Sequence, residues 1–396
     1  MRLRGAVAFA VALVALLCAG LWLGGHPSVL PEFARETFVE EPGGLSGEAA
    51  EVLEDNYWRK VGPIELGNAS LQGMVRELRR RHHDRFTEYF SPENLESFNQ
   101  QIEGRFSGIG LSVSTVKRGL RVEQVFAGSP AAEAGIGIGA VIVSVNGKSI
   151  AGESSTEATK RIKGPEGTKV TIGVLDPKTK KVRKLTLTRA EVSLPNVSQK
   201  LEEVGGKELG YVRMLSFSES SSALLKRAVE KVEREGAEGI VLDLRHNPGG
   251  LLEEAVLSAS IFLPEGEVVV TTKSRTQADS SHETVGGNLP AKPLVVLVDG
   301  GTASAAEILT AALLDDGDAT TVGETTYGKG VFQEEHSLAN GGALKMTVGE
   351  YFTPDGENLA RTHGIHPDVK VPFDPGAKGD NQKTRALRVL AGKVGA

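Results

Sequence analysis

The feature that most restricts the fold of this chain is an apolar run followed by a glycine-containing turn and an alanine-rich segment. Leu294–Val298 consists only of Leu and Val, which predicts a buried strand. Ala305–Leu314 is rich in Ala and Leu and predicts a helix. Ser304 falls at their junction, where a helix N-terminus offers backbone N–H groups and partial positive charge. A serine there can attack a carbonyl group while the N–H of Ala305 stabilises the oxyanion.

Ser304 needs a base, because a serine hydroxyl is a weak nucleophile at neutral pH. His246, His336 and His363 lie in loop-like segments, and no Asp or Glu spacing marks any of them as the middle member of a triad. Lys329, which stands between two glycines, is the better candidate. It can accept a proton only if burial lowers its pKa, since desolvation disfavours the ammonium form.

Gln333 follows Lys329 by four residues and would orient its amine. Four residues span roughly 6 Å in a helix but about 13 Å in a strand, so this pair predicts a local helical turn. Spacing alone leaves simpler interpretations open, namely a serine that caps or packs a helix start and a lysine in a solvated turn. The Gly-x-Ser-x-Gly elbow is also missing, because Thr302 and Ala306 occupy its glycine positions.

Three motifs in order resemble those of the C-terminal processing peptidases, or tail-specific proteases. They are Leu-Asp-Leu-Arg-His-Asn-Pro-Gly-Gly at 242–250, Thr-Ala-Ser-Ala-Ala-Glu at 302–307 and Gly-Glu-Thr-Thr-Tyr-Gly-Lys-Gly at 323–330. The resemblance extends over roughly residues 47–373. It implies a serine endopeptidase that needs no cofactor.

The same resemblance implies roles for individual residues. Ser304 would be the nucleophile and Lys329 the general base, with Gln333 holding the lysine as in the bacterial periplasmic and sporulation-type branch. The Asn-Pro-Gly-Gly turn would supply an oxyanion-hole N–H from Gly250, with Gly249 as the neighbouring alternative.

The chain departs from the family pattern at a few positions. His246 stands where the family usually has Asn, and Ala306 replaces a common second Ser. The segment Asp84-Arg85-Phe86-Thr87 stands where the family often reads Asp-Pro-Tyr-Ser. None of these changes removes an expected catalytic group, but His246 could alter hydrogen bonding near the oxyanion turn.

The segment 105–189 reads as short strands, glycine-rich turns and two short helices. Its order of motifs, at 106–113, 128–135 and 138–147, resembles a PDZ domain of the circularly permuted bacterial kind. A turn formed by Gly108, Ile109, Gly110 and Leu111 would leave N–H groups for a terminal carboxylate, and the adjoining strand edge would pair with an extended peptide. The simpler alternative is a glycine bulge with no ligand.

Alternating strand and helix patterns surround the motifs. Residues 209–215 and 239–244 predict strands, 221–235 and 251–262 predict helices, Asn340-Gly341-Gly342 predicts a hairpin turn, and a short helix is expected near 384–392. Such βαβ units predict a mixed or parallel sheet. With the resemblance, the expected fold is a multidomain α/β and α+β chain with a ββα-type core like that of crotonase or ClpP.

The N-terminus predicts export. Arg2 and Arg4 precede an apolar stretch, Gly5–Gly25, that would reach about 31 Å as a helix, enough to cross a bilayer. No Ala-x-Ala site follows, so an uncleaved signal anchor is favoured over a cleaved signal peptide, with the rest of the chain outside the cytoplasm. Cys18 is the only cysteine, so no disulfide is expected.

Helices are also expected at 47–59, 71–82 and 92–101, and the basic cluster 79–83 is interpreted as a solvated helix end. A net charge of −6 implies no nucleic-acid partner. The expected domains are a signal anchor or signal peptide at 1–25, a linker and helical platform at 26–104, a PDZ domain at 105–190, the protease core at 191–373 and a tail at 374–396.

The expected activity is the processing or degradation of extracytoplasmic proteins from their free C-termini, at the cytoplasmic membrane. Self-association and an adaptor protein remain open. Three alternatives are a non-catalytic PDZ scaffold, a crotonase-type acyl-CoA enzyme, and a metal site at His363-Gly364-Ile365-His366, which lacks acidic partners. No metal is expected.

Overall fold

The structure is a computed structural model that describes residues 44–395 except 127, 178, 194–195 and 316–317. It divides into two units, Met1–Tyr89 and Phe90–Ala396. The short strand β1 (Glu88–Phe90) spans the division. The predicted anchor Gly5–Gly25 lies outside the described residues. Among the residues that are described, no helix combines the length and apolar character needed to cross a membrane.

The first unit contains α3 (Gly44–Asn56) and α4 (Pro63–His82), so both helices predicted there are confirmed. Helix α4 starts before residue 71, where the predicted helix began. Pro63 fits in its first turn, because the first turn of a helix has no use for the N–H that proline lacks. Its basic end is exposed, as expected: Arg80 and Arg81 both bind Glu77 on the helix surface.

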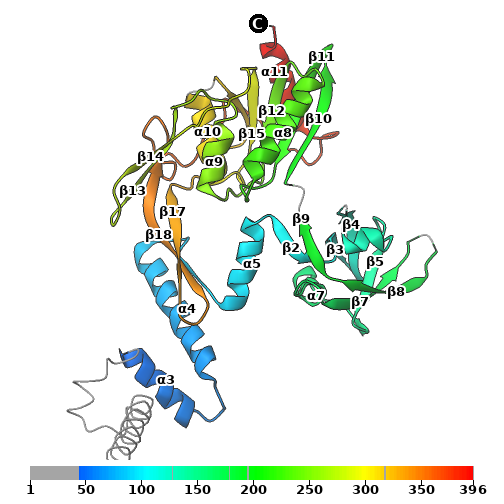
Figure 1. Ribbon diagram of the computed structural model, residues 1–396, viewed down its shortest axis with the longest axis vertical. Helices are drawn as coiled ribbons and strands as arrows, with labels where there is room; N and C mark the ends of the chain where they lie inside the picture. The colour runs from blue at the N-terminus through cyan, green and yellow to red at the C-terminus, as the bar shows by residue number, and fades with distance from the viewer. Residues whose placement is uncertain (1–43, 127, 178, 194–195, 316–317, 396) are drawn as a thin grey trace, which may run out of the picture. The chain divides into compact units, whose positions relative to one another are not determined.

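The second unit begins with α5 (Pro92–Ile102) and a pair of strands, β2 (Arg105–Gly108) and β9 (Ala190–Ser193), that enclose a PDZ-like module. Its sheet has the order β3-β4-β5-β7-β8, with β6 (Lys148–Ser149) paired to β5 (Figure 1). The strands are β3 (Leu111–Val116), β4 (Gly119–Val125), β5 (Val141–Val145), β7 (Lys169–Leu175) and β8 (Val182–Thr188). The two short helices expected here are α6 (Pro130–Glu133) and α7 (Ser155–Ile162).

A six-stranded sheet with the order β10-β11-β12-β15-β16-β19 forms the centre of the remaining chain. Its strands are β10 (Val197–Val204), β11 (Lys207–Met214), β12 (Gly239–Asp243), β15 (Leu294–Val298), β16 (Thr320–Gly323) and β19 (Val369–Lys370). Strand β10 is antiparallel to β11 and the other pairs are parallel, so the predicted mixed sheet is confirmed.

Helices cover both faces of this sheet (Figure 1). One face packs against α8 (Ser221–Arg234), α9 (Leu252–Ala259) and α10 (Ala305–Asp315), and the other against α11 (Asn381–Lys393). Because side chains alternate along a strand, Ile240 and Leu242 of β12 join the first cluster while Val241 joins the second. Asp243 therefore points toward the face that α11 covers.

A second sheet contains β13 (Val268–Ser274), β14 (Ser280–Glu283), β17 (Val331–Ser337) and β18 (Ala343–Phe352), all paired antiparallel. The predicted turn at Asn340–Gly342 joins β17 to β18, and the N–H of Leu338 donates to the carbonyl of Gly342 at 2.8 Å. The helical turn predicted for Lys329 and Gln333 is wrong. Gln333 lies in β17, where a bulge between Phe332 and Gln333 shifts the register.

Candidate active site

Ser304 is the last residue of the turn that follows β15, directly before the first residue of α10, as the sequence predicts. Its φ of 56° is left-handed, which is uncommon for a residue with a Cβ and marks local strain. The preceding turn is fixed by Asp299, whose Oδ1 accepts from the N–H of Gly301 at 2.9 Å. The serine is therefore held at the helix start in a backbone conformation that normal N-cap residues, which are extended, do not adopt.

Glu307 joins the serine turn to the lysine loop. Its Oε2 accepts from the N–H of Ser304 at 2.9 Å and from the N–H of Lys329 at 3.0 Å. Its Oε1 accepts from the N–H of Gly328 at 2.7 Å and from the hydroxyl of Thr326 at 2.5 Å. Burial raises the pKa of Glu307, although these four bonds oppose the shift. The backbones of Ser304 and Lys329 thus meet at one carboxylate oxygen.

The side chain of Lys329 is partly buried, and its amine donates to Oε1 of Gln333 at 2.7 Å. Lys329 precedes β17 and Gln333 lies beside the bulge in that strand, so regular strand spacing does not separate the two residues. Burial and, to a smaller extent, the positive charge of Lys345 on β18 together lower the pKa of Lys329 to about 8, against a smaller opposing effect of Glu307. Near neutral pH a usable fraction of this amine carries no charge.

Tyr351 of β18 completes the buried polar cluster. Its hydroxyl donates to the carbonyl of Lys329 and hydrogen-bonds the side chain of Ser304. Burial, followed by the nearby charge of Glu307, raises its pKa well above the ordinary value. The phenol therefore stays neutral and holds the lysine loop against the serine turn.

The Asn247–Gly250 turn lies directly against Ser304. A Cβ placed on Gly249 would come within 2.8 Å of both Ser304 Cβ and the backbone nitrogen of Ala305, and its φ of 92° also favours glycine. The N–H of Gly249 is used internally, since it donates to Oδ1 of Asn247 at 2.9 Å. Within the part of the chain that the structure describes, the N–H groups of Gly250 and Ala305 have no hydrogen-bond partner.

His246, the histidine that departs from the family pattern, is bound by the carboxylate of Asp299. His246 has a φ of 59°, and its N–H and ring Nδ1 contact the two oxygens of Asp299 at 2.9 and 2.8 Å. His366 contacts Thr325 at 3.2 Å. Among the described residues, no group of three or more His, Cys, Asp or Glu side chains is arranged to hold a metal ion.

The PDZ-like module carries a second candidate site. A small cavity of about 40 Å³ is lined by the predicted turn at 108–111, by Thr159 and Ile162 of α7, and by Lys163, which caps that helix. Gly110 has a φ of 79°, and a Cβ there would overlap Ser129 at 2.1 Å, so the turn requires glycine. Strand β3 follows directly and ends its sheet, because β4 is its only neighbour in the described order.

Sequence reasoning missed three of the residues that build the active-site cluster. Glu307 had a detectable signal, since Ser304 and Glu307 have the spacing of a capping box, in which the glutamate accepts from the serine N–H. Tyr351 and Lys345 had none, because only the pairing of β18 with β17 brings them to the lysine.

The PDZ-like module and the mixed α/β core, with a strained serine beside a buried lysine, define a PDZ-containing peptidase of the serine class. Residues 208–371 match the sequence model of peptidase family S41, and residues 97–175 match that of the PDZ domain. The chain is 32% identical over 381 residues to the carboxy-terminal processing protease CtpA of Bacillus subtilis (strain 168), with 93% of this chain and 78% of the relative covered. The chain therefore belongs to peptidase family S41, as a C-terminal processing serine protease with a PDZ domain.

Other similarities agree. A probable CtpA-like serine protease of Staphylococcus aureus (strain MRSA252) is 35% identical over 341 residues, which cover 86% of this chain and 65% of the relative. The solved photosystem II D1 C-terminal processing protease has a TM-score of 0.50 and 28% identity, with 87% and 96% of the two chains covered. A putative S41 protease from Bacteroides fragilis NCTC 9343 shares the fold, with a TM-score of 0.54, 19% identity, and 87% and 97% coverage. Family membership favours the peptidase over the non-catalytic scaffold and the acyl-CoA enzyme.

Proposed function

We propose that this protease cleaves extracytoplasmic proteins near their free C-termini, with Ser304 as nucleophile and Lys329 as general base. The observation that carries the proposal is the shared hydrogen bonding of Glu307, whose Oε2 accepts from the backbone N–H of both residues. The lowered pKa of Lys329, about 8, supports its role as a base. Gln333 orients the amine through the 2.7 Å bond to its Oε1.

In the proposed reaction, the neutral amine of Lys329 removes the proton of Ser304 as Oγ bonds to the scissile carbonyl carbon. The oxyanion accepts hydrogen bonds from the N–H groups of Ala305 and Gly250, which are available for it, whereas the N–H of Gly249 is bound to Asn247. The resulting ammonium protonates the leaving amine, and an ester on Ser304 remains. Water then attacks this ester with Lys329 again as base, which releases the new C-terminus.

The PDZ module supplies the preference for a free terminus in this proposal. Backbone N–H groups of the turn 108–111 hold the terminal carboxylate, and the free edge of β3 pairs with the last residues of the substrate. The apolar part of the cavity accepts the terminal side chain, which favours a small or medium apolar residue. Substrates are therefore proteins or peptides with free C-termini.

The proposal includes export and attachment to the cytoplasmic membrane through residues 5–25. It rests on the two arginines before this apolar stretch and on its length. Alkaline phosphatase, which is active only outside the cytoplasm, fused after residue 43 should be active and remain in the membrane fraction. A fusion that is inactive, or active only in soluble fractions, would contradict the anchor.

The function is tested by comparing the protein C-termini of the cell envelope in cells that carry the wild-type chain and cells that carry Ser304→Ala. Ser337→Ala, at the exposed end of β17, is the matched control. Substrates should keep extended C-termini, or accumulate, only in the Ser304→Ala cells. Identical C-termini in all three strains would refute the proposed activity.

A further inference from the structure

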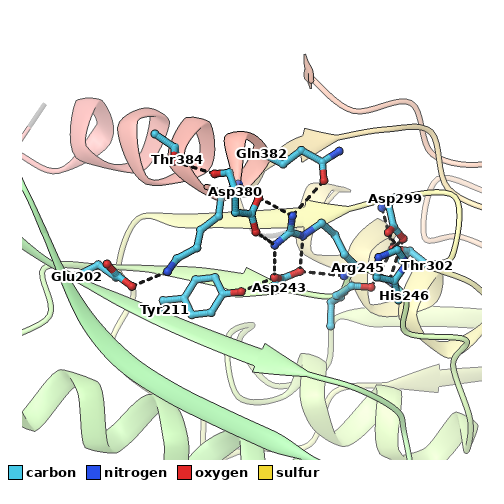
Figure 2. A network of polar contacts seen from close by, with 12 residues as sticks. Glu202, Tyr211, Asp243, Arg245, His246, Asp299, Thr302, Asp380, Gln382 and Thr384 are labelled. Carbon is cyan, nitrogen blue, oxygen red and sulfur yellow. Dashed lines mark hydrogen bonds and ion pairs between the residues drawn. The ribbon is translucent and has the colours of Figure 1, made fainter. Parts of the chain in front are cut away.

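A partly buried ion pair joins Asp380, at the start of the C-terminal helix, to Arg245 (Figure 2). Arg245 precedes the turn that carries Gly249 and Gly250. Arg245 lies just after β12 and just before that turn, and its side chain is only 9% exposed. Its guanidinium binds Asp243 in two places, Nε to Oδ1 at 2.9 Å and Nη2 to Oδ2 at 2.7 Å. It also binds Asp380 in two places, Nη1 to Oδ1 at 2.9 Å and Nη2 to Oδ2 at 2.7 Å. Paired bonds of this kind fix the orientation of a guanidinium as well as its position.

Asp380 is itself held rigidly at the start of α11. Its Oδ1 caps the helix by accepting from the N–H of Lys383 at 2.9 Å. Gln382, the second residue of α11, accepts a hydrogen bond from Nη1 of Arg245 at 3.1 Å and donates one to the carbonyl of Val371 at 2.9 Å. The helix packs through Leu387 and Leu390 against the central sheet. The contact to Arg245 is thus anchored in a packed element, and it comes from residues after 371, where the match to the peptidase family ends.

The turn has little freedom on its other side. The N–H of His246 donates to Asp299 at 2.9 Å, and the carbonyl of Asn247 accepts from the N–H of Ala303 at 3.0 Å. Gly249 lies so close to Ser304 that there is no room for a Cβ. A displacement of about 1 Å in such a site can cost on the order of a hundredfold in rate. The contact of Asp380 with Arg245 should therefore influence the direction of the N–H of Gly250.

We propose that Asp380 is a positioning residue for catalysis: through Arg245 it holds the Gly249–Gly250 turn where the oxyanion forms, so the C-terminal helix is part of the catalytic apparatus. The inference rests on the proposed roles of Ser304 and Gly250. Asp380 does not touch substrate. Its side chain is 38% exposed, so water can replace it, and Arg245 keeps Asp243 as a partner. Loss of the Asp380 charge should therefore loosen the turn and leave the protein folded.

The test compares Asp380→Asn, which keeps a capping side chain, with Arg388→Gln. The control removes a charge from an exposed position of the same helix. We expect Asp380→Asn to lower kcat/KM about 10- to 100-fold. A peptide aldehyde that forms a tetrahedral adduct with Ser304 should bind more weakly by the same factor. Peptide affinity, measured in a Ser304→Ala background, should stay within about twofold of the parent value. Asp380→Glu should recover most of the rate, and Arg388→Gln should retain it.

The inference is overturned if Asp380→Asn has normal kcat/KM, if Arg388→Gln loses as much, or if aldehyde affinity is unchanged while the rate falls. Thermal unfolding curves of both variants are recorded, and rates are compared only at a temperature well below both midpoints. The rates then refer to folded protein. Ser304→Ala separates this result from the proposed function. If Ser304→Ala is inactive and Asp380→Asn is normal, only the positioning role fails. If Ser304→Ala is active, the proposed function fails and this inference with it.

Discussion

The two candidate sites of the molecule are built in opposite ways. The site around Ser304 consists of buried and partly buried side chains whose charges and hydrogen bonds influence one another, with Glu307 as the common acceptor and Lys329 at a lowered pKa. The groove of the PDZ module consists of a glycine turn and a free strand edge, with backbone groups as the expected contacts. Function at the first site should depend on individual side chains and on pH, whereas function at the second should depend on the chemistry of the ligand terminus.

The largest expected effect separates the two sites by substitution. Ser304→Ala and Lys329→Ala should each lower kcat/KM by at least about a thousandfold, and the double variant should lose little more, because the two act as one unit. Peptide binding to the PDZ module should not change. Lys273→Ala, an exposed lysine on β13, is the matched control. Near-normal turnover of Lys329→Ala, measured with a fluorogenic peptide, would mean that another group is the base.

The next effect comes from the ligand. Amidation of a substrate C-terminus removes a negative charge and an acceptor oxygen, and each lost bond to a charged group costs roughly 1.5–3 kcal/mol. The amidated peptide should therefore be bound and cleaved about 10- to 150-fold less well. Deletion of residues 105–189 should abolish this preference. Equal cleavage of both peptides by the intact protease would exclude carboxylate recognition by the turn 108–111.

The two sites should also respond differently to pH. Lys329 must be neutral to act, so kcat/KM should fall about tenfold per unit as the pH drops below about 8 and level off above that value. The ratio of the cleavage rates of the free and the amidated peptide should stay constant from pH 6 to 9, because a terminal carboxylate with a pKa of about 3.3–3.7 remains ionised. Titration of cleavage rates for both peptides checks both statements. A rate that is flat from pH 6 to 9 would contradict a lysine base.

The smallest expected effect concerns Gln333, which orients the amine without reacting. Gln333→Ala should lower kcat/KM by about tenfold or less, consistent with the loss of one hydrogen bond to a charged or polar group. Gln333→Glu should move the pH profile to higher values, since a nearby negative charge favours the ammonium form. A pH profile of Gln333→Glu that matches the wild type would show that this side chain does not sense the proton on Lys329.

Sequence patterns predicted the parts of the fold that depend on local order. Strand β15 and helix α10 were predicted nearly to the residue, because an all-apolar run and an Ala-rich helix leave few alternatives. The position of Ser304 between them followed from the same pattern. The hairpin at Asn340–Gly342 was equally local, since Asn-Gly turns have a strong conformational preference.

What depended on strand pairing was not predictable. The helical turn expected for Gln333 was wrong because this residue lies in strand β17, beside a bulge that no residue pattern marks. Tyr351 and Lys345 reach the site only through the β17–β18 pairing, and Asp380 reaches Arg245 only because α11 returns across the sheet. In the turn predicted at 108–111, Gly110 has a left-handed φ that other residues avoid, whereas Gly108 ends strand β2.

The shared oxygen of Glu307 has a consequence for how the chain can vary. The backbone separation of Ser304 and Lys329, the proposed nucleophile and base, is set by two N–H groups that donate to one acceptor oxygen. Side-chain changes in the connecting loops leave that separation intact. A one-residue insertion or deletion between Thr326 and Lys329 moves the N–H of Lys329 away from the carboxylate while every reacting group is retained. Loop length near the base is therefore constrained more tightly than loop composition.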